Sequence, residues 1–358
     1  VSGKTMRVFL VGMPLMLGGA NSEAAHTALL WRRFGVEVTC LHFTKCHCGK
    51  PGEAPLDSNQ WTDRLRAAGV DFVPIESGHL ADVPGLAGSV LSSFCHQHTL
   101  HNWPEFASIG CKLIWSPCMT YTMSREEDAF RQVPASVIHF QSRFQAMELV
   151  AQYTAWGCRE FRRITGAFEP LPFNPRPRLP GEPFVIGRLA RPCRTKWSPL
   201  LWDIIARVAR RACPVEVLCQ GWSTELTMHC GEPPIGAECL PANTLTATEF
   251  LSRCHAMICP NWSVKENWPR IGLESMSVGV PLVVDDAGGW PEMAGEAGVL
   301  CNTTEDYADA LVKLATDETR RQDAIHHGLD RLDEICNPSA VYGHWVDCWR
   351  SIRSSECP

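Results

Sequence analysis

The chain is predicted to be an α/β protein of two domains, each a parallel sheet wound with helices on both faces. Three observations support this fold class. Strand-like and helical patterns alternate along the 358 residues, this length suits two domains of ordinary size, and a proline-rich stretch divides the alternation near its middle. Alternation of this kind is typical of doubly wound parallel sheets.

The first half contains strand-like segments separated by helical patterns. Strands are expected at residues 6–11, 36–43, 70–75, 90–94, 112–115 and 136–140. The clearest helical patterns cover residues 22–34, 58–68 and 143–156. We assign residues 1–168 to an N-terminal domain.

The proline-rich stretch covers residues 169–183 and has six prolines in fifteen positions. Proline lacks the backbone donor and disfavours helix in the residue before it, so a stiff, extended connector is expected here. This stretch is the best domain boundary in the chain.

The alternation resumes after the connector. Strands are expected at residues 184–188, 215–219, 256–259, 281–285 and 298–301. Helices are expected at residues 198–211, 248–253, 270–278, 304–315 and 319–335. Residues 184–336 therefore form the predicted C-terminal domain. A last helical pattern, 339–352, follows Asn337-Pro338, and the terminal region 337–358 is expected to cross back onto the first domain.

Composition excludes some classes of protein. The chain is 45% hydrophobic and 20% charged, which is typical of a soluble globular protein, and its net charge of −6 argues against non-specific adhesion to nucleic acid or membranes as its main role. No apolar run is long enough to span a membrane. The 18 cysteines are scattered through strand and helix patterns, so we expect reduced thiols and a cytoplasmic location.

The segment from Glu266 to Glu274 is the most informative in the chain. The two carboxylates lie eight positions apart with a Pro-Arg turn between them, and a short helical pattern follows that Gly279 ends. Free N–H groups at a helix start, beside two acceptor side chains, suit a ligand with phosphates and hydroxyls, such as a sugar nucleotide. Without the surrounding pattern, one capping and one solvated glutamate would be the simpler interpretation.

Two further turns have the residue types of anion sites. The strand that opens the second domain ends at Arg188, and Lys196 follows eight residues later as a helix begins. Two cations there suit a diphosphate leaving group, although a solvated basic loop is an equal alternative. Gly18-Gly19 follows the first strand, where backbone can approach a ligand closely, although an ordinary strand–helix turn is as good an explanation.

Four motifs follow one another along the chain: Gly18-Gly19, Arg188 with Lys196, the Glu-x7-Glu segment and Gly288-Gly289. In this order they resemble the motifs of the retaining GT-B glycosyltransferases of the family 4 type. The resemblance implies two Rossmann-like domains facing one another across a cleft. It also implies a metal-independent hexosyltransferase without a cofactor, using a UDP- or GDP-sugar donor, with UDP expected. Trp268-Pro269 and Ser275-Met276-Ser277 depart from the usual residues but keep their size and shape.

The resemblance also implies roles for individual residues. Arg188 and Lys196 would hold the donor diphosphate, Glu266 the transferred sugar and Glu274 the ribose. Amides of the helix start would cap the phosphates, and the glycine pair would close over them from the other domain. A long gap after Arg188 leaves either Arg191 or Lys196 as the second cation. The full predicted donor set is Gly18, Gly19, Arg188, Arg191, Lys196, Leu240, Glu266, Pro269, Arg270, Ile271, Gly272, Leu273 and Glu274.

Histidines and aromatic residues complete the predicted site. His96 and His98 follow the strand 90–94, and we expect one of them to act in the cleft on the acceptor side, so both join Glu266, Arg188 and Lys196 as catalytic candidates. Structural packing and metal binding are the alternatives, although neither these histidines nor Cys46-His47-Cys48 has ordinary zinc spacing. Trp290 is expected to stack on a sugar ring because it lies in a glycine loop.

The sequence leaves the acceptor and the oligomeric state open. A saccharide, a lipid or a small molecule is expected as acceptor. The alternative acceptor is DNA containing modified bases, bound in a basic channel. A sugar-nucleotide epimerase and a non-catalytic binding protein of the same fold are also compatible with the sequence. The arginines proposed for the DNA channel are Arg159, Arg162, Arg163, Arg176 and Arg178.

Overall fold

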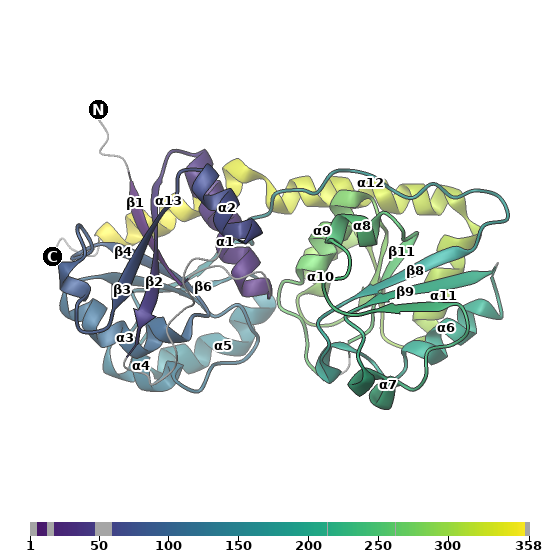
Figure 1. The fold of residues 1–358 in the computed structure, drawn as a ribbon, viewed down its shortest axis with the longest axis horizontal. Coiled ribbons are helices and arrows are strands. Elements are labelled where there is room, and N and C mark those ends of the chain that lie inside the picture. The colour runs from purple at the N-terminus through teal and green to yellow at the C-terminus, as the bar shows by residue number, and fades with distance from the viewer. Residues whose placement is uncertain (1–5, 13–17, 47–58, 213, 262, 355–358) are drawn as a thin grey trace. The chain divides into compact units, whose positions relative to one another are not determined.

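The computed structural model describes residues 6–12, 18–46, 59–212, 214–261 and 263–354. The chain forms two compact units (Figure 1). The first unit comprises Val1–Phe168 with Cys336–Pro358, and the second comprises Glu169–Ile335. Each unit contains one parallel sheet, as the alternation of patterns predicted.

The sheet of the first unit has seven strands in the order β3-β2-β1-β4-β5-β6-β7. The strands are β1 (Arg7–Val11), β2 (Glu37–Lys45), β3 (Asp71–Glu76), β4 (Val90–Phe94), β5 (Lys112–Ser116), β6 (Val137–Phe140) and β7 (Phe161–Arg163). The six predicted strands are confirmed. The edge strand β7 was not predicted, because Phe-Arg-Arg is too short and too polar to show an apolar pattern.

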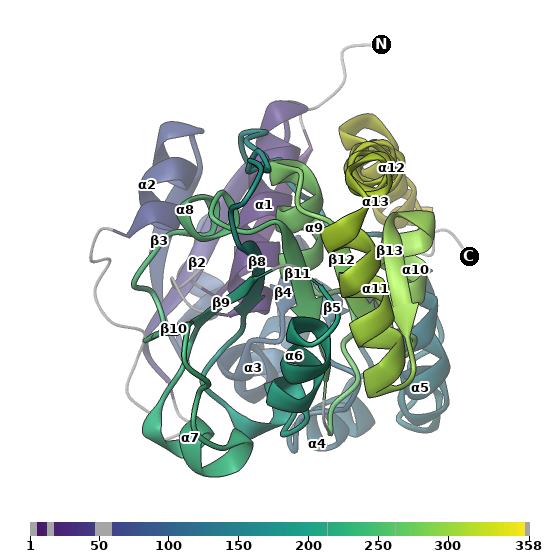
Figure 2. The ribbon, with the colours of Figure 1, turned by 90° about the vertical axis from the view of Figure 1, so that its right-hand side faces the viewer.

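Helices cover both faces of this sheet (Figures 1 and 2). One face packs against α1 (Gly19–Arg33), α2 (Gln60–Ala67) and α13 (Pro338–Ser354), and the other against α3 (Gln97–Ser108), α4 (Glu126–Gln132) and α5 (Arg143–Ala155). The helices α3 and α4 were not predicted. Pro104 lies inside α3, and proline normally argues against a helix interior.

The last helix, α13, completes the core of the first unit. Its Trp345 meets Trp31 of α1 edge to face, with ring centroids 5.0 Å apart, and Trp349 lies beside both. The break before α13 forms because Pro338 lacks an N–H and because the Asn337 side chain accepts the amide of Ala340 at 3.1 Å.

The sheet of the second unit has six strands in the order β10-β9-β8-β11-β12-β13. The strands are β8 (Phe184–Leu189), β9 (Val215–Gln220), β10 (Ala237–Leu240), β11 (Ala256–Cys259), β12 (Leu282–Asp285) and β13 (Gly298–Cys301). The five predicted strands are confirmed. Ala-Glu-Cys-Leu of β10 was missed because four residues at a sheet edge show little pattern.

Helices lie on both faces of the second sheet (Figures 1 and 2). One face carries α6 (Leu201–Ala209), α7 (Thr224–Cys230) and α11 (Thr304–Thr316), and the other carries α8 (Ala247–Leu251), α9 (Arg270–Val278) and α10 (Trp290–Ala294). The helix α12 (Glu318–Cys336) follows α11. The short helices α7 and α10 were not predicted. The predicted bounds of α9 match the structure.

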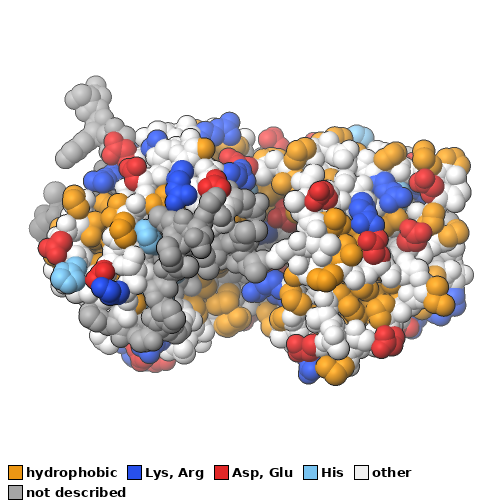
Figure 3. Space-filling view, viewed as in Figure 1, with side chains coloured by type: hydrophobic (Ala, Val, Ile, Leu, Met, Phe, Trp, Pro, Cys, Tyr) orange, Lys and Arg blue, Asp and Glu red, His pale blue; other side chains and the backbone are white. Residues whose placement is uncertain are grey.

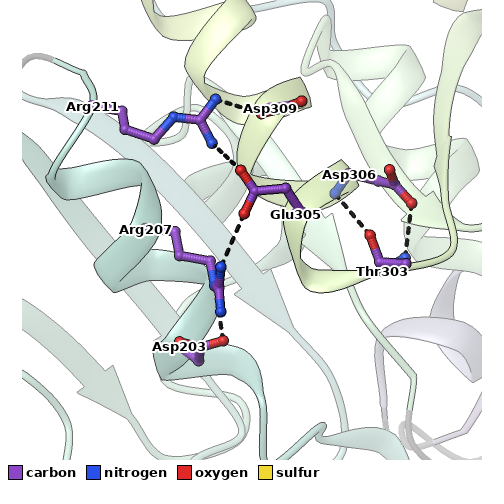
Figure 4. Close-up of polar contacts among 7 residues, drawn as sticks. All are labelled: Asp203, Arg207, Arg211, Thr303, Glu305, Asp306 and Asp309. Atoms are coloured by element: carbon purple, nitrogen blue, oxygen red, sulfur yellow. Dashed lines mark hydrogen bonds and ion pairs between the residues drawn. The ribbon is translucent and has the colours of Figure 1, made fainter.

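An exposed ion-pair network ties α6 to α11 (Figure 4). The Glu305 carboxylate accepts from Arg207 at 2.9 Å and from Arg211 at 2.7 Å, and Arg211 also pairs with Asp309. Charged side chains of both signs are intermixed on this unit's surface in the view of Figure 3. Exposed pairs of this kind contribute modestly to stability, so the network aligns the two helices rather than holding the fold.

The proline-rich segment 169–183 belongs to the second unit. The Leu171 amide donates to the Ser277 hydroxyl at 3.2 Å, and the Asn174 amide donates to the Val278 carbonyl at 3.0 Å. Gly279 ends α9 with φ of 90°, and a Cβ there would lie 2.6 Å from the Phe173 ring. The segment therefore packs on the C-terminal end of α9.

Among the described residues, the helices are all too short or too polar to cross a membrane. The cysteines described are free thiols, ten of them buried and five partly buried. Buried cysteines in such positions pack as small apolar residues.

We expect the first unit to lose stability in mild acid through His139. This buried imidazole bonds to the Ser116 hydroxyl at 2.7 Å and the Ile164 carbonyl at 2.9 Å, and desolvation lowers its pKa to about 4. The folded protein holds His139 neutral, so the free energy of unfolding keeps its full value above the unfolded pKa near 6.5. It falls by about 3 kcal/mol in all as the pH drops from there towards 4.

Thermal denaturation from pH 7 to pH 4 measures this loss. We expect His139→Gln to start less stable and to show a shallower decline than the unsubstituted protein. Parallel declines in the two proteins would contradict the role of His139.

Candidate functional site

Charged side chains gather at the carboxyl end of the second unit's sheet. Lys196, in the turn after β8, donates to both carboxylate oxygens of Glu266, at 2.7 and 2.6 Å. Both side chains are 18% exposed, so the pair is largely removed from water but still accessible. The structure thus brings together two predicted residues that are 70 positions apart.

Arg188, in β8, contacts this turn. Its guanidinium donates to the Lys196 carbonyl and lies 5.3 Å from the centroid of the Trp197 ring. The residue is only 3% exposed, and its Nε has no hydrogen-bond partner among the described residues. A buried cation with an unused donor is poised to interact with an anion. Arg191 differs, because its side chain is exposed.

Helix α9 begins at Arg270, shortly after Glu266 in the sequence. Pro269 is the N-cap residue. The Gly272 amide, one of the amides predicted to bind phosphate, donates instead to the Pro269 carbonyl at 2.9 Å within the first turn. Leu273 is fully buried, while Ile271 is partly buried. The partly buried Glu274 lies one turn into the helix. Burial raises the pKa of its carboxyl, and the Arg270 charge opposes that shift.

Two glycine turns hold the loops that carry these charges. A Cβ on Gly221, which follows β9 with φ of 91°, would lie 1.8 Å from the Ala190 carbonyl oxygen. A Cβ on Gly289 would lie 1.5 Å from the Asn267 carbonyl oxygen, and the Gly289 amide donates to the Glu266 carbonyl at 2.8 Å. Only glycine permits these close approaches, so the turns fix the backbone beside Lys196 and Glu266.

One feature of this site was missed in the sequence. Asp285, the last residue of β12, accepts the Asn261 amide at 2.8 Å and the Tyr307 hydroxyl at 2.6 Å. Burial raises the pKa of its carboxyl, the two hydrogen bonds and the nearby Arg188 charge lower it, and Glu266 raises it. The available signal was an acidic residue at the carboxyl end of a predicted strand, where ligand sites of parallel sheets collect.

The loop that follows Leu240, a predicted donor-binding residue, is fixed by Gln220. This side chain donates to the Leu245 carbonyl at 2.9 Å and accepts the Leu245 amide at 2.8 Å. Leu240 ends β10, and its carbonyl accepts the amides of Gly221 and Trp222. The loop between Leu240 and Leu245 is therefore anchored at both ends.

In the first unit, Gly18 and Gly19 begin α1. Gly18 is the N-cap residue with φ of 109°, and no heavy atom of the described residues lies within 4 Å of the position that a Cβ on Gly19 would take. The preceding residues 13–17 lie outside the described part of the chain. Within the described part of the chain, Gly19 therefore leaves room for a close approach to the start of this 15-residue helix.

The two histidines lie where β4 ends and α3 begins. The His96 ring stands 3.1 Å from the Thr99 hydroxyl through Nδ1, and a Cβ on Gly12 would meet that ring at 2.7 Å. His98 stacks on Phe43, with centroids 5.7 Å apart, and lies 5.3 Å from His96. Both side chains are partly exposed, so either can reach a ligand at this end of the sheet.

The expectation that Trp290 stacks on a sugar ring is wrong. Trp290 is only 1% exposed, and a Cβ on Gly272 would meet its ring at 2.9 Å. The glycine of α9 allows the indole to approach the helix closely, and the buried ring cannot stack on a sugar. Of Cys46-His47-Cys48, His47 and Cys48 lie outside the described residues.

Most of the arginines proposed for a DNA channel have intramolecular partners. They divide between the two units, and Arg178 stacks over the Phe184 ring at 5.6 Å. The remaining contacts are Arg159 to the Thr154 carbonyl, Arg162 to Glu160, and Arg176 to the Arg253 carbonyl. These contacts give the DNA interpretation no support.

Residues 183–317 match the family model described as glycosyl transferases group 1. This range contains the whole charged cluster from Arg188 to Asp285. The second unit carries a glycosyltransferase group 1 domain. A comparison of the sequence with curated proteins found no match.

Solved structures extend the similarity beyond the group 1 domain. HepE from Anabaena, in complex with UDP-glucose, is 14% identical with a TM-score of 0.69, covering 97% of this chain and 100% of HepE. An S. aureus TarM variant, in complex with fondaparinux, α-GlcNAc-glycerol and UDP, is 8% identical with a TM-score of 0.74, covering 96% and 99%. The pneumococcal O-GlcNAc transferase GtfA, with UDP and GlcNAc, is 10% identical at 0.68, covering 98% and 99%. The chain has the GT-B fold.

Gly289→Ala tests the close approach behind Glu266. The added methyl group requires the Asn267 carbonyl to move, and we expect glycosyl transfer to fall about 100-fold while the circular dichroism spectrum is unchanged. Gly343→Ala is the matched control, since no heavy atom of the described residues, apart from its own helix backbone and chain neighbours, lies within 4 Å of that Cβ position. Equal activity of the two variants would show that the glycine turn does not set the site.

Proposed function

We propose that this group 1 glycosyltransferase moves a hexose from a UDP-sugar to an acceptor and leaves the anomeric configuration of the sugar unchanged. The observation that carries the proposal is the contact of Lys196 with both oxygens of Glu266, beside the buried Arg188, whose guanidinium donates to the Lys196 carbonyl. One cluster thus offers cations to a diphosphate and a carboxylate to sugar hydroxyls. The UDP or UDP-glucose in complex with HepE, TarM and GtfA supports the choice of UDP.

The cations act on the leaving group. Negative charge grows on the diphosphate as the glycosidic bond breaks, and Lys196 and Arg188 stabilise that charge. The positive end of α9, beginning at Arg270, adds to their field. We propose that these fixed charges replace a metal ion. Activity that persists in EDTA would support this, and loss of activity in EDTA would overturn it.

The carboxylate acts on the sugar. We propose that Glu266 accepts hydrogen bonds from hydroxyls of the transferred hexose and that Glu274 accepts hydrogen bonds from hydroxyls of the ribose. Retention is proposed to follow from attack on the same face as the departing phosphate, which takes the acceptor's proton. Two-dimensional NMR of the product's anomeric proton tests retention, and inversion would contradict it.

The acceptor is proposed to bind the first unit at the carboxyl end of β4. His96 and His98 lie there, with the imidazole of His96 oriented by Thr99. Imidazoles suit hydroxyl groups of a saccharide, a glycolipid head group or a small molecule. Screening acceptors of these three kinds for release of UDP identifies the class.

Lys196→Ala and Glu266→Gln separate the two halves of the site. We expect each to reduce transfer about 100- to 1,000-fold, because each removes a group that acts in the transition state. Only Lys196→Ala should weaken binding of UDP alone, since Glu266→Gln removes no cation and frees the Lys196 ammonium. Calorimetry with UDP and assay of UDP release measure the two effects.

Arg207→Ala is the control, because it breaks an exposed ion pair of the same unit and should leave transfer unchanged. Transfer at the unsubstituted rate by Lys196→Ala would sink the site assignment. Donor binding without release of UDP, across the acceptor panel, would favour a non-catalytic binding protein. Conversion of the donor without an acceptor would favour an epimerase.

A further inference from the structure

The end of β12 and the turn after it contact the loop that carries Glu266 at two points. This Glu266 loop comprises residues 260–269 between β11 and α9. Near its start, the Asn261 amide donates to Asp285 at 2.8 Å, and towards its end the Glu266 carbonyl accepts the Gly289 amide at 2.8 Å. In the described part of the chain the loop contains no helix or strand, so its geometry depends on such contacts.

Asp285 is itself firmly held. Its second oxygen accepts the Tyr307 hydroxyl at 2.6 Å, and Tyr307 is only 4% exposed in the core between α11 and the sheet. The same hydroxyl lies 3.3 Å from the Cys259 carbonyl, at the end of β11. Asp285 therefore joins the rigid core to the first residues of the Glu266 loop.

The position of Asp285 matters to the charged cluster. Arg188 and Glu266 both lie close enough to act on the Asp285 carboxyl electrostatically, Arg188 favouring its charge and Glu266 opposing it. Asp286, one residue along, is exposed and bonds instead to the Asn302 side chain at 3.2 Å.

We infer that Asp285 is a positioning residue for glycosyl transfer, which fixes the Glu266 loop through the Asn261 amide and is itself oriented by Tyr307. The inference rests on the proposed function, since it assigns Asp285 to the geometry of Glu266. Asp285 acts through the loop and touches neither donor nor acceptor. Its effect is on the rate of transfer rather than on the binding of the diphosphate.

Three substitutions separate this role from charge and from stability. Asp285→Ala removes both hydrogen bonds. Asp285→Asn keeps them, because its carboxamide oxygen accepts the Asn261 amide while its NH2 donates to the Tyr307 oxygen. Asp286→Ala removes the same charge from the adjacent residue and serves as the control.

We expect Asp285→Ala to lower kcat at least about tenfold and to change the KM for the UDP-sugar less than about threefold, because a small misplacement of a reacting group is costly. Asp285→Asn should restore kcat to within about threefold of the unsubstituted enzyme, and Asp286→Ala should not change it. Equal loss in Asp285→Asn and Asp285→Ala would overturn the inference in favour of a charge effect.

Hydrogen exchange without substrate gives a second readout that is independent of activity. Asp285→Ala should speed amide exchange in a peptide covering residues 260–269, while Asp286→Ala should not. Unchanged exchange in Asp285→Ala would overturn the inference. Faster exchange in Asp285→Ala, combined with an unsubstituted protein that transfers no sugar, would refute the proposed function and leave the positioning contact established.

Tyr307→Phe covers the case in which Asp285→Ala does not fold. It keeps the buried ring and removes only the hydroxyl that orients Asp285. We expect a fall in kcat and faster exchange of residues 260–269, both smaller than the effects expected of Asp285→Ala. A variant identical to the unsubstituted protein in both measurements would overturn the role of Tyr307 and, with it, the inference.

Discussion

The burial of the Arg188 guanidinium is the constraint on which the site depends. A cation that is 3% exposed needs compensation, and it receives a backbone carbonyl, an indole face and the nearby Asp285 charge. These partners come from two segments, the turn after β8 and the end of β12. Holding the cation therefore also holds the turn that presents Lys196 to Glu266.

Much of this arrangement is readable in the sequence, for physical reasons. The buried strands β8, β11 and β12 appear as short apolar runs because helices cover both faces of the sheet. The bounds of α9 follow from Pro269 before it and Gly279 after it. The order of Arg188, Lys196, Glu266 and Glu274 along these elements then places the charges at one end of the sheet.

The parts that could not be predicted depend on contacts between distant residues. Nothing local indicates that Tyr307 bonds to Asp285, 22 positions earlier, or that Trp290 fills the space left by the missing side chain of Gly272. The strand β10 and the helix α3 were missed because their own local signals are poor. The apolar pattern of β10 is weak, and α3 contains Pro104, so tertiary packing overrides the local preference of each segment.

The return of α13 to the first unit has a consequence for how the chain is made. Trp345 and Trp349 fill the space beside Trp31, so the first unit lacks part of its interior until the last helix has been synthesised. The second unit, Glu169–Ile335, is encoded without interruption. On the ribosome it can therefore finish folding while the earlier unit still waits for its closing helix.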